Sequence, residues 1–282
     1  MRTITVYPNG ATAGTVSGKT GGDVGKRGKV RGWTPAAARR NVRFLYSVRA
    51  DRLPAYGIAF TLTLRDCPPT PDAWNRLRLA FIHRLRRQQA VCWHWVTEWQ
   101  RRGVPHLHGC VFFPPLDTPG SPHTSPADLL CDWLEVARDY GAGPRGQHLR
   151  TIDGWRGWAL YLARHAARGV AHYQRRPEAV PSQWEGRTGR LWGRGGDWPV
   201  EEGLRLEVDD DGFYAFRRLV RRWAIADARR NRDQRALLFA RRMLRCNQRE
   251  LSQVRGISEW IDQDQALLLV AVVGSMGHSV HQ

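Results

Sequence analysis

The sequence predicts an α+β fold in which an antiparallel sheet is covered by helices. Between residues 56 and 169 the hydrophobic period alternates between that of strands and that of helices, in the order β, α, β, β, α, β, α. This order contains a split βαβ arrangement, as in ferredoxin-like and RRM-like sheets. Antiparallel sheets of this kind can leave one face open to a ligand.

Composition and pattern divide the chain into five parts. They are a flexible basic arm (1–32), a basic helix (33–54), the α+β domain (55–175), a Trp/Gly-rich connector (176–212) and a basic helical C-terminal region (213–282). The arm is predicted because this stretch is rich in Gly, Ser, Thr, Lys and Arg and poor in apolar residues. The basic helix has Thr34 as a candidate N-cap and Pro35 at its first position.

Each element of the α+β domain has its own signal. YGIAFTLTLRD is typical of a buried strand. The next helix has one apolar face, made by Trp74, Leu77, Phe81 and Leu85. VCWHWVTEWQ and PHLHGCVFF, joined by a short turn at RRGV, predict a β-hairpin. A second amphipathic helix (SPADLLCDWLEVARDYG), a short strand (QHLRTI) and a third helix (GWRGWALYLARHAARG) follow. The connector contains one more short strand, GLRLEV.

The charge of the chain indicates a polyanionic partner. Its 282 residues include 44 Lys and Arg against 26 Asp and Glu, a formal net charge of +18. Arg supplies most of this charge and suits phosphate oxygens, and 13 Trp offer stacking surfaces. We therefore expect nucleic acid as the partner, with the C-terminal region as a second contact surface. The side chains expected on DNA are Arg101, Arg102, Arg168, Arg217, Arg218, Arg221 and Arg222.

Cysteine usage and hydropathy indicate a cytoplasmic protein. The five cysteines are odd in number and form no CxxC pair, which argues against a disulfide framework and a zinc ribbon. The N-terminus lacks the apolar core of a signal peptide. The apolar run at 266–273 is shorter than the about 20 residues needed to span a bilayer.

Two histidines stand one residue apart in the second strand of the hairpin, in the stretch GVPHLHGCVFF. If the hairpin is centred near Arg102, Glu98 lies opposite His106, and His106 and His108 point to the same face. Two imidazoles and one carboxylate then leave open positions for water and phosphate oxygens, which is typical of a catalytic cation site. This mixed set of nitrogen and oxygen ligands fits Mg²⁺ or Mn²⁺.

This stretch also has other interpretations. A structural zinc ion would use Cys92, His94 and Cys110, which share one face in the same register, although no CxxC or HxxxH spacing supports it. Alternatively, the histidines are core residues. A register shifted by one residue would separate the carboxylate from both imidazoles.

The helix after the last strand of the domain carries a polar stripe. Its residues stand at i, i+3, i+4 and i+7 and are Tyr161, Arg164, His165 and Arg168. A tyrosine flanked by two arginines suits nucleophilic attack on a phosphodiester that a cation polarises. The alternative is an ordinary interfacial tyrosine on a basic helix.

Together these segments resemble the HUH endonucleases, specifically the replication initiators of rolling-circle phages and plasmids. PHLHG resembles the His-hydrophobic-His motif of that family, and AFTLTL resembles its first-strand motif. YLARHAAR, as Y-x-x-R-H-x-x-R, is similar to its YxxKYxxK helix. The resemblance covers about 56–173 and looks closest to initiators of filamentous and other single-stranded DNA phages of bacteria.

The resemblance implies an enzyme that nicks one strand at a replication origin and stays joined to the 5′ phosphate through Tyr161. Glu98, His106 and His108 would hold Mg²⁺ or Mn²⁺. The released 3′ hydroxyl would prime a host polymerase. A separate helicase would unwind the duplex, since the chain has no P-loop.

Two departures from the family pattern bear on the chemistry. Arg164 stands where the family usually has Lys, and Arg does not deprotonate, so proton transfer at this position is in doubt. His165 replaces a second tyrosine, which implies a single-tyrosine enzyme unless Tyr173 acts later in the cycle. Rival functions are a relaxase or single-strand transposase of the same chemistry, and a non-enzymatic RRM-like single-strand-binding module.

Overall fold

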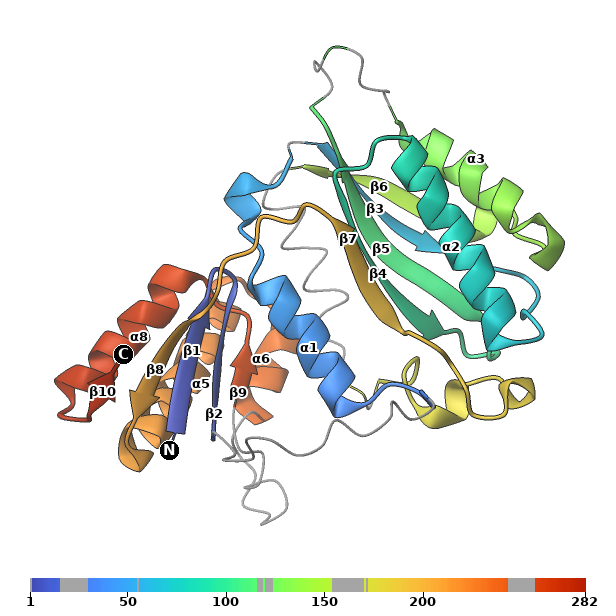
Figure 1. Cartoon of the computed structure of the whole chain (residues 1–282). Coiled ribbons are helices and arrows are strands. Elements are labelled where there is room, and N and C mark those ends of the chain that lie inside the picture. Colours follow the sequence, from blue (N-terminus) through green and yellow to red (C-terminus); the bar gives the residue numbers. More distant parts are fainter. Residues whose placement is uncertain are drawn as a thin grey trace, which may run out of the picture. The chain divides into compact units, whose positions relative to one another are not determined.

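The computed structural model describes residues 2–15, 30–54, 56–115, 119, 124–153, 170, 172–242 and 257–282. Within these residues the chain forms two five-stranded antiparallel sheets and six α-helices, which confirms the α+β class (Figure 1). The contacts divide the chain into two units. Unit 1 comprises residues 1–24, 46–48 and 200–282, and unit 2 comprises residues 25–45 and 49–199.

The sheet of unit 2 contains the strands of the predicted α+β domain. Its order is β6-β3-β5-β4-β7, and every neighbouring pair is antiparallel. The strands are β3 (Tyr56–Leu62), β4 (Cys92–Trp99), β5 (Pro105–Phe113), β6 (His148–Asp153) and β7 (Trp192–Gly196). Because β5 is antiparallel to both β3 and β4, these two strands run parallel, with β5 between them. This is the predicted split βαβ arrangement.

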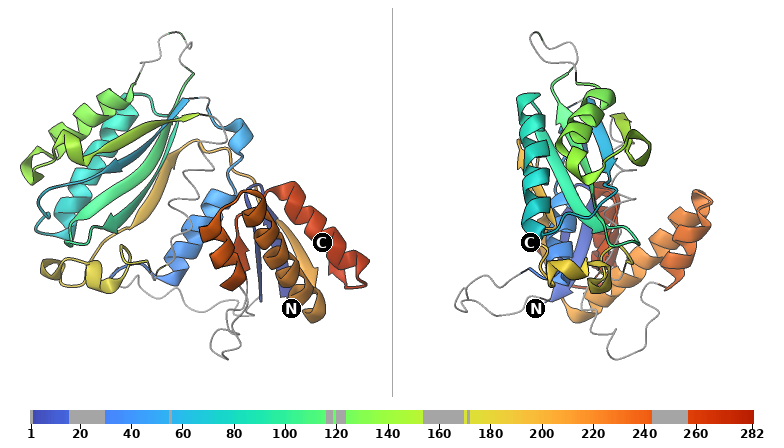
Figure 2. Two further views of the ribbon diagram at one scale, coloured as in Figure 1. Left: turned by 180° about the vertical axis from the view of Figure 1, so that it is seen from behind. Right: turned by 90° about the vertical axis from the view of Figure 1, so that its right-hand side faces the viewer.

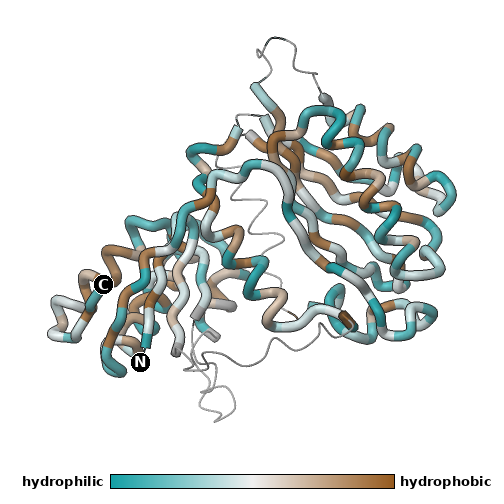
Figure 3. Tube along the Cα trace, in the orientation of Figure 1, coloured by the Kyte–Doolittle hydropathy of each residue, from teal (hydrophilic) through white to brown (hydrophobic). Residues whose placement is uncertain are grey.

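Two helices of unit 2, α2 (Pro71–Arg87) and α3 (Pro126–Val136), pack on one face of this sheet (Figure 1). Their first turns are capped by side chains: the Ala73 amide donates to Thr70 Oγ1 at 3.1 Å, and the Asp128 amide donates to Ser125 Oγ at 3.2 Å. Figure 3 shows the alternation of hydrophobic and hydrophilic residues along α2.

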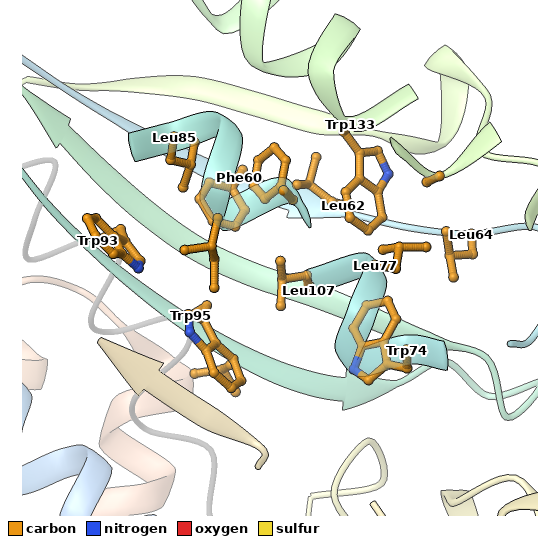
Figure 4. Close-up of a cluster of buried hydrophobic side chains, with 14 of the residues drawn as sticks. Phe60, Leu62, Leu64, Trp74, Leu77, Leu85, Trp93, Trp95, Leu107 and Trp133 are labelled. Carbon is orange, nitrogen blue, oxygen red and sulfur yellow. The ribbon is translucent and has the colours of Figure 1, made fainter. Parts of the chain in front are cut away.

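The core of unit 2 lies between these helices and the sheet. The four residues predicted on the apolar face of α2 are all buried. Figure 4 shows how helix and strand side chains meet there, from α2 and α3 on one side and β4 and β5 on the other; they include Trp74, Leu77, Leu85, Trp93, Trp95, Leu107 and Trp133. Burial of this apolar surface is what fixes the face of the sheet that turns inward.

The β4–β5 hairpin has the predicted register. Glu98 lies opposite His106, and Val96 lies opposite His108. The loop closes where the Gly103 amide donates to the carbonyl of Gln100 at 2.9 Å. Gly103 has a φ of +76°, a conformation that glycine adopts without strain. Residues of even number therefore share one face of both strands, as the sequence predicted.

A fifth strand, β7, corrects the prediction for the connector, in which this segment had no regular structure. It pairs with β4 along the edge of the sheet. A Cβ atom at Gly193 or Gly195 would lie 2.7 or 2.3 Å from the indole ring of Trp95 or Trp93. The glycines thus let the strand lie directly on two tryptophans, and they also removed the side chains by which a strand is predicted.

The sheet of unit 1 corrects the predicted flexible arm for residues 2–15. It has the order β10-β8-β1-β2-β9. The strands are β1 (Arg2–Tyr7), β2 (Gly10–Thr15), β8 (Leu204–Val208), β9 (Ile257–Glu259) and β10 (Val280–His281). β1 pairs with its neighbour β2 and also with the distant β8, the strand predicted as GLRLEV. The short strands β9 and β10 were not predicted.

The predicted helices outside the α+β domain are present in the described residues. They are α1 (Pro35–Tyr46), α5 (Asp210–Arg230), α6 (Gln234–Arg242) and α8 (Gln263–Ser275). The Ala37 amide donates to Thr34 Oγ1 at 3.1 Å, which confirms the predicted N-cap. Side chains of α5 and α8 form the core of unit 1 with its sheet, and α5 lies across the strands in the view from behind (Figure 2). None of the described helices has the length and hydropathy of a membrane span.

The third helix predicted for the α+β domain lies outside the described residues. The segment 154–169 follows β6 directly and contains the whole predicted polar stripe. The other six elements of the predicted order, from β3 to β6, are confirmed.

Candidate metal centre

The two histidines and the glutamate of the hairpin converge on one face of the sheet of unit 2. Their ligand atoms all lie within 4.8 Å of one another. Glu98, His106 and His108 are only 1, 2 and 5 % exposed. The group lies on the face of β4 and β5 opposite to the tryptophan core, as the register requires.

The distances suit one shared cation. The Nε2 atoms of His106 and His108 are 2.6 Å apart, and His108 Nε2 is 3.4 Å from Glu98 Oε2. Two ligands at right angles on an ion about 2.1 Å from each would lie roughly 3 Å apart. The observed separations bracket this value, so small side-chain adjustments would bring all three atoms into the coordination sphere of one ion.

A hydroxyl group orients one of the imidazoles. Thr61 lies opposite His108 on the neighbouring strand β3, and its Oγ1 is 2.9 Å from His108 Nδ1. This hydrogen bond fits the tautomer in which Nδ1 carries the proton and Nε2 keeps its lone pair for a metal. A partner of this kind on the second nitrogen is typical of metal-bound histidines.

A buried arginine orients the carboxylate. Arg175 Nε donates to Glu98 Oε1 at 2.6 Å, and the arginine side chain is fully buried. Its guanidinium carbon lies 4.2 Å from the centre of the Trp33 ring, a cation–π contact. With Oε1 held by Arg175, Oε2 is the oxygen nearer to the imidazoles. The adjacent Gln174 places its side-chain amide 3.3 Å from His106 Nε2.

The donor set therefore fits a divalent cation. Two imidazole nitrogens and one carboxylate oxygen leave further positions for water or substrate oxygens, and the residues behind the ligands hold two of them in place. Glu98, His106 and His108 form a possible metal site, as predicted from the sequence.

The zinc alternative is not supported. Within the described part of the chain, a single group of three His, Cys, Asp or Glu side chains has its ligand atoms this close, and it contains neither cysteine of the hairpin. His94 instead bonds through Nε2 to Asn41 Oδ1 of α1 at 2.7 Å and stacks on Phe44. Burial, with the charges of Arg175 and Arg194 nearby, lowers the pKa of His94 to about 3, so this histidine is a neutral core residue.

The predicted nucleophile helix lies outside the described residues. Tyr161, Arg164, His165 and Arg168 all fall within 154–169. The other candidate, Tyr173, is described: its ring is 46 % exposed, and the guanidinium carbon of Arg101 lies 5.4 Å from its centre. Its neighbour Gln174 touches His106, so Tyr173 stands beside the metal centre in the chain.

The arginines predicted on DNA differ in their surroundings. Arg102 donates to the carbonyls of Leu64 and Arg65, and so holds the loop between β4 and β5 to the end of β3. On α5, Arg217 lies over the rings of Phe213 and Tyr214, and Arg221 donates to the carbonyl of Arg241 at 3.0 Å. Arg101, Arg218 and Arg222 are exposed.

Sequence reasoning missed the residues behind the metal ligands. Thr61 was within reach, because it lies in the strand that a ferredoxin-like order places beside the histidines. Arg175 and Trp33 come from segments with no regular pattern, so no local signal links them to Glu98.

Taken together, an antiparallel sheet with a His-His-Glu centre on one face defines a class of cation-binding α+β proteins, and comparison with known sequences specifies the family. Residues 57–173 match the family described as Replication-associated protein ORF2/gene 2 protein. Two proteins described as "Putative replication protein", from Xylella fastidiosa strains 9a5c and Temecula1, are each 46 % identical to the chain. The alignments span 288 and 267 residues, which cover 99 and 92 % of this chain and 99 % of each relative.

A phage protein extends the same relationship. The replication-associated protein of Pseudomonas phage Pf3 is 41 % identical over 280 residues, and 99 % of each chain is covered. No solved structure matches the chain significantly. The chain belongs to this replication-associated protein family, which confirms the resemblance to phage replication initiators.

Proposed function

We propose that this protein initiates rolling-circle DNA replication by nicking and rejoining single-stranded DNA at a replication origin. The observation that supports this most strongly is the His-His-Glu centre on a β6-β3-β5-β4 sheet, the order of a ferredoxin-like palm, in a chain that belongs to a replication-associated family. It would act as an HUH-type endonuclease and strand transferase in the cytoplasm of a bacterial host.

The proposed reaction begins with Tyr161. Its phenol oxygen attacks the scissile phosphorus, the bond from phosphorus to O3′ breaks, and the 3′ oxygen takes up a proton and leaves as a hydroxyl. The 5′ phosphate stays on the tyrosine as a phosphodiester until the new 3′ end displaces it. Arg164 and Arg168 would neutralise charge on the phosphate, and His165 would lie one turn from the phenol.

The metal centre would serve the same phosphate. Mg²⁺ or Mn²⁺ bound by Glu98, His106 and His108 would polarise a non-bridging oxygen. Imidazole ligands favour Mn²⁺ over Mg²⁺. Thr61 and Arg175 would keep the ligands oriented toward the ion.

A nicking assay tests the proposal. The substrate is a single-stranded oligonucleotide with the origin sequence of the replicon that encodes the protein, incubated with Mn²⁺. Wild type should give a covalent protein–DNA adduct, and Tyr161→Phe should give none. Mass spectrometry of the adduct identifies both the nucleophile and the cut site.

Two outcomes would redirect this proposal. Cleavage that survives in Tyr161→Phe moves the nucleophile to Tyr173, which stands exposed beside the metal centre. His106→Ala should abolish cleavage while DNA binding persists. If binding and cleavage are lost together, the histidines support the fold and not the chemistry.

The alternatives have less support. A non-enzymatic RRM-like module needs stacking aromatics on its open sheet face. In the β4–β5 hairpin that face carries His and Glu, and Trp93, Trp95 and Trp99 are buried in the core. A relaxase or single-strand transposase would share the chemistry, and the family membership favours replication over both. We further propose single-stranded origin DNA, a host polymerase and a host helicase as partners.

A further inference from the structure

A cavity of about 390 Å³ lies at the end of β3, outside the metal centre. Its lining includes Thr63, Arg65, Arg102, Gly143, Arg145 and Gln147, and none of the three metal-binding candidates. We name it the β3 pocket. Its volume falls in the usual range for small-ligand sites, about 300–1,000 Å³.

The β3 pocket adjoins the face that carries the metal centre. Alternate residues of β3 and its extension, from Ile58 to Leu64, enter the core, so Thr61 and Thr63 point to the other face. Thr61 holds His108 Nδ1, and Thr63 lines the pocket. Two residues of an extended strand span about 6.6 Å, so the pocket begins one short step from the ion-binding atoms.

The wall of the β3 pocket is held by a network of hydrogen bonds. Gln147 Oε1 accepts from the Thr63 amide at 2.6 Å, and Gln147 Nε2 donates to the carbonyls of Thr63 and Gly143 at 3.1 and 2.8 Å. Thr63 Oγ1 donates to the carbonyl of Gly146 at 2.9 Å. These bonds tie the loop before β6 to the end of β3, so a ligand would meet a preformed site and would not have to order the loop.

The charge of the β3 pocket suits a phosphodiester. Arg65, Arg102 and Arg145 line it, and none of its described lining residues is acidic. Arg65 pairs with Asp66 at 2.9 Å, and the guanidinium of Arg102 donates to carbonyl oxygens, which leaves its charge uncompensated by those contacts. The exposed Arg145 is the lining arginine best placed to meet a ligand from solvent.

A basic strip continues from the pocket along β6. His148 lies opposite Thr61 and Arg150 lies opposite Ala59, so both side chains are on the face of the metal centre, and both are exposed. The pocket and the strip together form a continuous positive path beside the candidate ion site.

We propose that the β3 pocket binds one nucleotide of the single-stranded DNA substrate next to the cleaved phosphodiester, and that neighbouring phosphates lie over His148 and Arg150. This inference rests on the proposed function for the identity of its ligand. The arginines meet the phosphate, and the glycine-lined wall leaves room for sugar and base.

Binding of a fluorescein-labelled, mixed-sequence single-stranded oligonucleotide of roughly 20 nucleotides tests the proposal by anisotropy in EDTA. Arg145→Glu should weaken binding roughly tenfold, because it replaces a phosphate contact by repulsion. Arg76→Glu makes the same charge change at an exposed position of α2, on the opposite face of the sheet, and should change binding less than about twofold.

A second variant fills the pocket without changing charge. Gly143 has a φ of −120°, and an added Cβ there meets no atom within 4 Å, so Gly143→Trp is compatible with the backbone. It should also weaken binding roughly tenfold, whereas Gly143→Ala should bind as wild type does. Circular dichroism of each variant reports its fold.

Equal losses in Arg145→Glu and Arg76→Glu would overturn the proposal, since only net charge would then matter. Unchanged binding by a folded Gly143→Trp would overturn it as well. The assay needs neither the ion nor the tyrosine, so a failure of nicking with these binding losses intact would contradict the proposed function alone. Nicking with normal binding in both pocket variants would contradict the pocket alone.

Discussion

Thr61 illustrates what one neutral side chain contributes to the metal centre. Its hydroxyl fixes the ring of His108 from the adjacent strand. Thr61→Val keeps the shape and removes this hydrogen bond, so the affinity for Mn²⁺ should fall roughly tenfold or more. Isothermal titration with Mn²⁺ measures the change. Thr151→Val, at an exposed position of β6, is the matched control, and equal affinity in the two variants would show that the hydroxyl does not orient the imidazole.

Arg175 has a larger expected effect, because its charge is buried with that of Glu98. The ion pair spans 2.6 Å, and both side chains are excluded from water. Removing one partner of such a pair costs about 3–5 kcal/mol. Arg175→Met should therefore lower the free energy of unfolding by about this amount, measured with urea in EDTA. The exposed Arg76→Met should lie within about 0.5 kcal/mol of wild type, and a similarly small change for Arg175→Met would mean that the pair is not formed in solution.

His94 gives a pH dependence that the metal ligands do not share. Its pKa in the folded protein is about 3, because of burial first and of nearby arginines second, against about 6.5 in the unfolded chain. Between these values the unfolded chain binds more protons, so stability is full above about pH 6.5 and falls as the pH decreases toward 3.

A variant isolates this contribution. Between pH 6 and 4, the free energy of unfolding of wild type should fall more steeply than that of His94→Gln, by up to about 1.36 kcal/mol per pH unit. Urea titrations at several pH values measure both slopes. Parallel slopes would mean that His94 becomes protonated in the folded state.

At the scale of elements, the sequence predicted those whose signals are local. The 3.6-residue period of α2 and the Thr70 cap are properties of one segment, and so is the short turn that fixes the β4–β5 register. The hairpin of β1 and β2 was missed although Asn9 and Gly10 stand at its turn, a recognised hairpin signal. The polar and glycine-rich composition around it favoured an arm.

The strand β7 depends on contacts that its own sequence does not show. Gly195 lies against the ring of Trp93, where a Cβ would be 2.3 Å away. Gly195→Val should force the strand from the indole and lower the free energy of unfolding by about 1–3 kcal/mol, in urea titrations. Gly14→Val in β2, where an added Cβ meets nothing within 4 Å, should cost much less. Equal costs would show that intrinsic strand preference, and not the indole contact, selects glycine in β7.

At the scale of the whole molecule, distant pairing decides what a sequence pattern can reveal. β1 finds one partner beside it and the other, β8, near the opposite end of the chain. The metal centre shows the same division. Its three ligands come from one hairpin and were predicted with their register, whereas Thr61, Trp33 and Arg175 reach it from other segments. Local periodicity fixes which face a side chain takes, and tertiary contacts decide what meets it there.

The net charge of +18 also acts at this scale, through the salt dependence of DNA binding. Each phosphate contact adds about 0.7–0.9 to the slope of log affinity against log salt concentration. Arg218 and Arg222 are exposed one turn apart on α5, so Arg218→Ala combined with Arg222→Ala should reduce that slope by about 1.5. Fluorescence anisotropy at several salt concentrations measures it. Arg76→Ala combined with Arg87→Ala on α2 removes the same charge from the back of the other sheet, and a slope that falls equally there would mean that α5 forms no DNA contact of its own.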